Sequence, residues 1–174
     1  MSFETTVNGK RFAFWAHPRC GSTTLHHYFN VPIIADNHHK RWEVEGEGVT
    51  QVCVLKHPCD ILVSWFVLMP QWSNFKKFLK EAKHNQMVQA GRLFYLWRPG
   101  DIILLTERIE QDISQIIGKP LQINLRLNST PYKGDWPTYY DQESLEIVEN
   151  RFALDMKLWR TKIVPTLLKP DCVP

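Results

Sequence analysis

The sequence predicts an α/β fold in which a central parallel sheet is flanked by helices. Three apolar runs of strand length, residues 12–16, 49–55 and 101–105, are each followed by a turn and then by apolar residues at helical spacing. Strands that alternate with helices in this way pair in parallel through right-handed crossovers. The 174 residues, 44% of them apolar, suffice for one core, so we expect a single domain over residues 1–174.

The first half of the chain gives two strand–loop–helix units. Residues 12–16 lead through a Gly-Ser-Thr turn into a helix that contains residues 25–29. The second strand, 49–55, is followed by Pro58, which suits the first position of a helix, and by an apolar helical segment over 61–68.

The second half gives the third strand and most of the remaining helices. The strand over 101–105 follows a Pro-Gly turn, and Gly118 and Pro120 end the helix after it. Residues 124–137 read as an irregular loop. The helices expected here cover residues 74–83, 87–97, 109–117 and 141–159.

Composition and charge restrict the possible partners. The net charge is only +3, and no run of like charges forms the basic stripe that nucleic-acid binding needs. Residues 1–11 are polar, unlike a secretory signal, and the apolar run over 61–69 is too short to span a bilayer. The four cysteines have neither disulfide-framework nor metal-ligand spacing. We therefore expect a cytoplasmic protein without metal, nucleic acid or membrane partner.

A loop suited to anions follows the first strand, where residues 17–24 read His-Pro-Arg-Cys-Gly-Ser-Thr-Thr. Backbone N–H groups, hydroxyls and the charge of Arg19 would face an anion at the start of the following helix. A plainer interpretation is that Ser22 or Thr23 only caps that helix. The spacing and the lysine of a Walker A loop are missing, which disfavours a kinase-like nucleotide site.

A second loop of this kind follows the second strand. Lys56 stands at the end of that strand, and Ser64 lies eight residues further on, in an otherwise apolar helix. The lysine suits a second anionic group. The hydroxyl of Ser64 either bonds back to its own helix or points at a ligand.

In this order the two loops resemble the cofactor motifs of sulfotransferases that use 3′-phosphoadenosine 5′-phosphosulfate (PAPS), above all small, soluble members of the carbohydrate type. Weaker similarity to the same family continues through residues 75–79, 104–109, 128–130, 133–136 and 139–159. The resemblance implies a P-loop-like sulfotransferase architecture and sulfuryl transfer from PAPS, with 3′-phosphoadenosine 5′-phosphate (PAP) as the product. Two departures are that Lys56 stands where arginine is usual, and that the chain is short for the family.

The resemblance also implies roles for individual residues. Arg19 would bind the 5′-phosphosulfate and stabilise the leaving oxygen, which makes it a catalytic candidate. Lys56 and Ser64 would bind the 3′-phosphate. The cofactor-binding set is Arg19, Cys20, Gly21, Ser22, Thr23, Thr24, Lys56, Ser64, Lys133 and Gly134.

The acceptor needs a general base, and the family often places a histidine between the two cofactor loops. His39 or His38 is our candidate, with Glu43 and Glu45 as alternatives. Both histidines are equally compatible with a polar surface loop.

The sequence therefore predicts a sulfotransferase that acts on a small-molecule or carbohydrate acceptor through a hydroxyl or an amine. A non-catalytic protein that binds PAPS or PAP is an alternative, and a P-loop kinase-like phosphotransferase is a weaker one. Neither the acceptor nor the oligomeric state is indicated by the residues.

Overall fold

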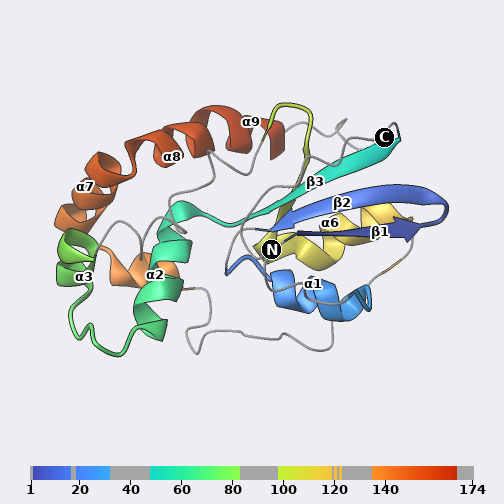
Figure 1. Cartoon of the computed structure of the whole chain (residues 1–174). Helices are drawn as coiled ribbons and strands as arrows, with labels where there is room; N and C mark the ends of the chain where they lie inside the picture. The colour runs from blue at the N-terminus through green and yellow to red at the C-terminus, as the bar shows by residue number, and fades with distance from the viewer. Residues whose placement is uncertain are drawn as a thin grey trace.

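The computed structural model describes residues 2–16, 19–31, 48–82, 98–118, 120, 122 and 135–167. These residues form an α/β fold on a four-stranded sheet (Figure 1). The strands lie side by side in chain order, as β1 (Ser2–Val7), β2 (Lys10–Ala16), β3 (Val49–Leu55) and β4 (Ile102–Leu105). The expected parallel part is present as β2, β3 and β4, but β1 runs antiparallel to β2, so the sheet is mixed.

The additional strand β1 forms a hairpin that the sequence analysis did not predict. Asn8 and Gly9 connect β1 to β2 with φ angles of 51° and 76°, the pairing of positive φ values that a two-residue type I′ turn requires. Phe3 is buried and stacks on Phe14 with 4.9 Å between ring centroids. One inward aromatic residue in a polar segment therefore anchors the edge of the sheet.

The helices of the first two thirds begin and end at the signals in the sequence. They are α1 (Ser22–Tyr28), α2 (Pro58–Leu68), α3 (Phe75–Glu81) and α6 (Ile109–Ile117). Pro58 occupies the first turn of α2, and Asn74 caps α3 by accepting a hydrogen bond from the N–H of Lys77. Gly118, at φ 67°, ends α6 in the left-handed conformation. The expected helix over 87–97 lies outside the described residues.

The carboxyl-terminal helix differs from the single helix predicted over 141–159. It divides into α7 (Gln142–Arg151), α8 (Ala153–Leu158), a π-helical turn (Trp159–Ile163) and α9 (Val164–Leu167). The break is at Phe152, whose backbone leaves helical geometry at φ −119° while its side chain is buried in the core with Val148 and Met156. Just before α7, a short 3-10 turn (Trp136–Tyr139) occupies the end of the loop expected over 124–137.

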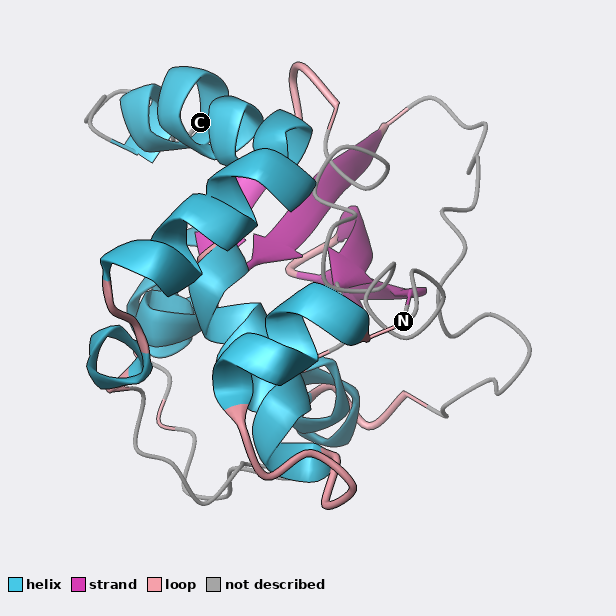
Figure 2. Cartoon of the chain, turned by 90° about the vertical axis from the view of Figure 1, so that its left-hand side faces the viewer, coloured by secondary structure: helices cyan, strands magenta, loops and turns pink. Residues whose placement is uncertain are grey.

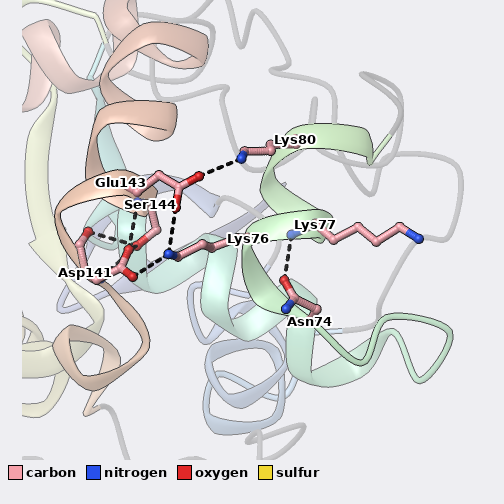
Figure 3. A network of polar contacts seen from close by, with 7 residues as sticks. All are labelled: Asn74, Lys76, Lys77, Lys80, Asp141, Glu143 and Ser144. Atoms are coloured by element: carbon pink, nitrogen blue, oxygen red, sulfur yellow. Dashed lines mark hydrogen bonds and ion pairs between the residues drawn. The ribbon is translucent and has the colours of Figure 1, made fainter.

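Charged side chains join α3 to α7 on the surface (Figure 3). Lys76 lies 2.6 Å from Asp141 and 2.8 Å from Glu143, and Lys80 lies 2.6 Å from Glu143. Asp141 also forms a capping box with Ser144 at the start of α7. These contacts hold the beginning of α7 against α3.

Helices cover both faces of the sheet. Phe14 and Val52 contact a large core cluster that includes Leu25 of α1 and Ile113 of α6. On the opposite face, Cys53 and Leu55 pack against Trp159 and Ile163 of the π-helical turn. Figure 1 shows α1 below the strands, α6 behind β1 and β2, and α8 and α9 above β3. Figure 2 shows helices in front of the strands when the chain is seen from the side of α3 and α7. No helix among the described residues is long and apolar enough to cross a membrane.

The aromatic cluster between α2 and α3 gives a test of this packing. Phe78 is fully buried, with ring centroids 5.7 Å from Phe66, 5.9 Å from Trp72 and 6.1 Å from Phe75. Phe78→Ala should lower the free energy of unfolding by about 3–5 kcal/mol in urea titrations, because it leaves a cavity in this cluster. Leu154→Ala, at a side chain that is 67% exposed, is the control and should cost less than about 0.5 kcal/mol. Equal losses in both variants would contradict the packing described here.

Candidate functional site

The loops singled out in the sequence lie at one edge of the sheet. Ala16 at the end of β2 pairs beside Val54, and Leu55 at the end of β3 pairs with Leu105 at the end of β4. The carboxyl ends of three parallel strands therefore meet at this edge, which is where ligands bind in α/β sheets. We call this edge, with Arg19–Ser22, Lys56, Asp60, Ser64, Thr106 and Glu107, the strand-end site.

The backbone of the first loop is turned into a left-handed conformation twice. Arg19 has φ 72°, and Gly21 has φ 75° and ψ 12°. Gly21 is the N-cap of α1, and no side chain makes the capping hydrogen bond. The plainer interpretation of Ser22 and Thr23 as N-caps is therefore wrong, and neither hydroxyl is committed to that role.

Cys20 contributes its backbone rather than a reactive thiol. The residue has no exposed surface, and burial raises the pKa of its thiol to about 12. A thiol in this state is neutral at physiological pH and a poor nucleophile. Its side chain is turned away from solvent, toward Thr106 after β4.

Lys56 and Asp60 form an ion pair at the end of β3. The lysine Nζ lies 3.0 Å from Asp60 Oδ2, and the two side chains are 12% and 3% exposed. Burial raises the pKa of Asp60, while the charge of Lys56 opposes this shift. The cation expected at this strand end is therefore present, and a carboxylate one turn along α2 holds it in place.

His57 is a structural residue of this loop. Its Nδ1 accepts the N–H of Cys59 at 3.2 Å and caps α2, while its ring stacks on Trp136 at 4.5 Å and meets the edge of Trp159 at 5.1 Å. Burial lowers the pKa of His57 to about 4, so the ring is neutral at physiological pH. The hydroxyl of Tyr140 donates to the carbonyl of Cys59 at 3.0 Å. These contacts fix the first turn of α2 behind Lys56.

The two loops touch through Arg19 and Ser64. The guanidinium Nε of Arg19 donates a hydrogen bond of 3.1 Å to the hydroxyl of Ser64, which is buried in α2. Burial lowers the pKa of Arg19, but a guanidinium remains charged at neutral pH. The hydroxyl of Ser64 therefore faces the first loop.

The end of β4 completes the strand-end site, and the sequence analysis did not include it among the site residues. The hydroxyl of Thr106 donates to the carbonyl of Leu55 at 3.0 Å and ties β4 to β3. A side chain at Gly21 would meet the Thr106 methyl group at 3.8 Å and Ile109 at 3.5 Å, so the first loop packs directly on this segment. The predicted parallel order of the strands could have indicated this segment, because the third parallel strand must end at the same edge as the other two.

The remaining candidates lie outside the described residues. They are His38, His39, Glu43, Glu45, Lys133 and Gly134. Within the described part of the chain, no group of three or more histidine, cysteine or acidic residues is arranged to hold a metal ion.

Comparisons with family models, with curated proteins and with solved structures gave no match. The fold and the strand-end site define an α/β protein with two cationic side chains, a buried serine hydroxyl and a left-handed backbone loop at one sheet edge. Guanidinium, ammonium, hydroxyl and backbone N–H groups are donors that phosphate-type and sulfate-type anions prefer.

Two substitutions at Arg19 test whether its left-handed backbone is strained. A non-glycine residue in this region is strained, so Arg19→Gly should be more stable than Arg19→Ala by about 1 kcal/mol in urea unfolding. Both variants lose the hydrogen bond to Ser64 equally, and the comparison therefore isolates the backbone. Equal stability, or a more stable alanine variant, would contradict a strained loop.

Proposed function

We propose that this chain is a sulfotransferase that moves a sulfuryl group from PAPS to an acceptor hydroxyl or amine by in-line displacement. The observation that carries the proposal is the contact between Arg19 and Ser64 beside Lys56, because it joins two anion-suited loops at the ends of neighbouring parallel strands. PAPS carries anionic groups at both its 5′ and its 3′ positions, and a ligand of this kind needs two adjacent sites.

In this proposal the cofactor-binding residues named in the sequence analysis have separate roles. The loop from Arg19 to Thr24 holds the 5′-phosphosulfate through backbone N–H groups, the hydroxyls and the guanidinium. Lys56 and Ser64 hold the 3′-phosphate, with Lys133 and Gly134 as further cofactor contacts. In-line transfer of this type depends mainly on positioning and on stabilising the charge that develops on the leaving oxygen. We assign that stabilisation to Arg19.

The acceptor side of the proposal rests on the sequence. A base must remove the proton of the acceptor as the new S–O or S–N bond forms, and His39 or His38 is the proposed base. Glu43 and Glu45 remain the alternatives. The proposed acceptor is a small molecule or a carbohydrate, and the proposed location is the cytoplasm.

Two alternative functions would use the same strand-end site. A non-catalytic protein that binds PAPS or PAP would share every described contact and would differ only in having no turnover. A kinase-like phosphotransferase has less support, because residues 17–24 contain no lysine for a nucleotide triphosphate and Asp60 is paired with Lys56.

Ligand choice tests the proposal directly. PAP should raise the melting temperature in thermal-shift measurements, because a ligand at a hundred times its Kd stabilises the native state by about 2.7 kcal/mol. ATP with magnesium should raise it much less, since the first loop lacks the Walker lysine. A larger shift with ATP and magnesium than with PAP would overturn the sulfotransferase proposal in favour of the kinase-like one.

The 3′-phosphate contact of Ser64 gives a second test. Ser64→Ala should weaken PAP binding roughly ten- to a hundredfold, the equivalent of one lost charge-assisted hydrogen bond. Binding of adenosine 5′-phosphate, which has no 3′-phosphate, should stay nearly unchanged. Ser73→Ala, at an exposed serine between α2 and α3, is the matched control. Equal losses for both ligands would show that Ser64 supports the fold or another part of the nucleotide.

A further inference from the structure

Two carboxylates lie at the strand-end site without a role in the proposed transfer. Asp60 is 2% exposed and bonds to Lys56 at 3.0 Å. Glu107 follows β4 in a short 3-10 turn (Thr106–Arg108), and the pairing of Leu55 with Leu105 brings this turn alongside Lys56. Acidic groups oppose the binding of anions, so their place here needs a physical account.

The charges of the described residues at this site balance. Two cations, Arg19 and Lys56, and two carboxylates, Asp60 and Glu107, lie here among the described residues. Lys56 and Asp60 form an ion pair, and the nearby Arg108 is paired with Asp112 at 3.2 Å. The other titratable groups that face the two carboxylates are neutral. They are Cys20, Cys59 and Tyr140, in each of which burial raises the pKa, to about 12 and about 11 for the two thiols. An anion that enters therefore meets no surplus of positive charge from this set.

Asp60 is paired with Lys56, and the charges of both residues act on Glu107. Burial raises the pKa of both Asp60 and Glu107, the charge of Asp60 raises that of Glu107 further, and Lys56 lowers both. A bound anion adds negative charge beside them and draws Lys56 toward itself. Both effects favour the protonated carboxyl, and by linkage the affinity for the anion must fall as the pH rises through the titration of the pair.

We propose that the pair formed by Asp60 and Glu107 takes up a proton from solvent when a phosphate-type anion binds at the strand-end site. The proton restores the charge balance and releases Lys56 for the ligand. The identity of the anion as PAP or PAPS rests on the function proposed above, whereas the proton uptake belongs to the cluster itself. The site then binds its cofactor more tightly as the pH falls.

Calorimetry of PAP binding in buffers of different ionisation enthalpy measures the protons exchanged. Wild-type protein should take up more protons than Asp60→Asn as the pH is lowered from 7.5 toward the titration of the carboxylates, and the difference removes the contribution of the phosphate groups of PAP. Without one negative charge, Asp60→Asn should bind PAP about tenfold more tightly at pH 7.5 and with a weaker dependence on pH.

Glu107→Gln is the second variant, in case Asp60→Asn fails to fold. Its side chain reaches solvent, and it should change PAP affinity and proton uptake in the same direction as Asp60→Asn. Glu81→Gln, an exposed carboxylate on α3 that pairs with Lys77, carries the same change of net charge and should behave as wild type.

The outcomes separate this inference from the proposed function. PAP binding with the same proton uptake in wild type and in the Asp60 and Glu107 variants overturns the inference and leaves the sulfotransferase proposal standing. If PAP does not bind, inorganic pyrophosphate is the second probe. If pyrophosphate binds with a proton uptake that Asp60→Asn abolishes, the inference about the carboxylates is supported although PAP is not the ligand. Failure to bind pyrophosphate, or binding without that uptake, overturns the inference.

Discussion

The parallel pairing of β2, β3 and β4 is the constraint on which the rest of the strand-end site depends. It brings Ala16, Leu55 and Leu105 to one edge, so that loops far apart in the sequence begin within contact distance of one another. The hydrogen bond from Thr106 to the carbonyl of Leu55 and the packing of Gly21 on Thr106 and Ile109 follow from that pairing. A slip of one residue in the register would turn Lys56 to the other face of the sheet.

The buried ion pair of Lys56 and Asp60 depends in turn on how α2 is held. A buried pair of this kind is weak support for stability, because the loss of hydration offsets most of the attraction. Here the position of Asp60 is fixed by its helix, whose first turn is capped by His57 and tied to Tyr140. The stacking of His57 on Trp136 and its edge contact with Trp159 connect that cap to the carboxyl-terminal segments. Residues remote in sequence thus orient the cation at the strand end.

Local signals in the sequence predicted the elements that have strong patterns, namely β3, α2 and α6. They missed β1, where Phe3 is buried among mostly polar neighbours, although the Asn8-Gly9 turn was visible. The break at Phe152 was also missed, because its apolar spacing continues a helical pattern while the backbone departs from it. Of the strand-end site, Arg19, Lys56 and Ser64 were identifiable from residue type and position. The roles of His57 and Glu107 depend on contacts between segments that are distant in the sequence, and the local sequence pattern does not indicate such contacts.

The left-handed backbone at Arg19 connects the fold to the proposed chemistry. A residue in this conformation costs about 1–3 kcal/mol unless surrounding contacts or a ligand offset the strain. Its half-buried guanidinium donates a hydrogen bond to the hydroxyl of Ser64. An anion at the same position would bond more strongly to the guanidinium and to the neighbouring backbone N–H groups. The left-handed backbone and the charge of Arg19 therefore support the proposal of an anionic ligand at this segment.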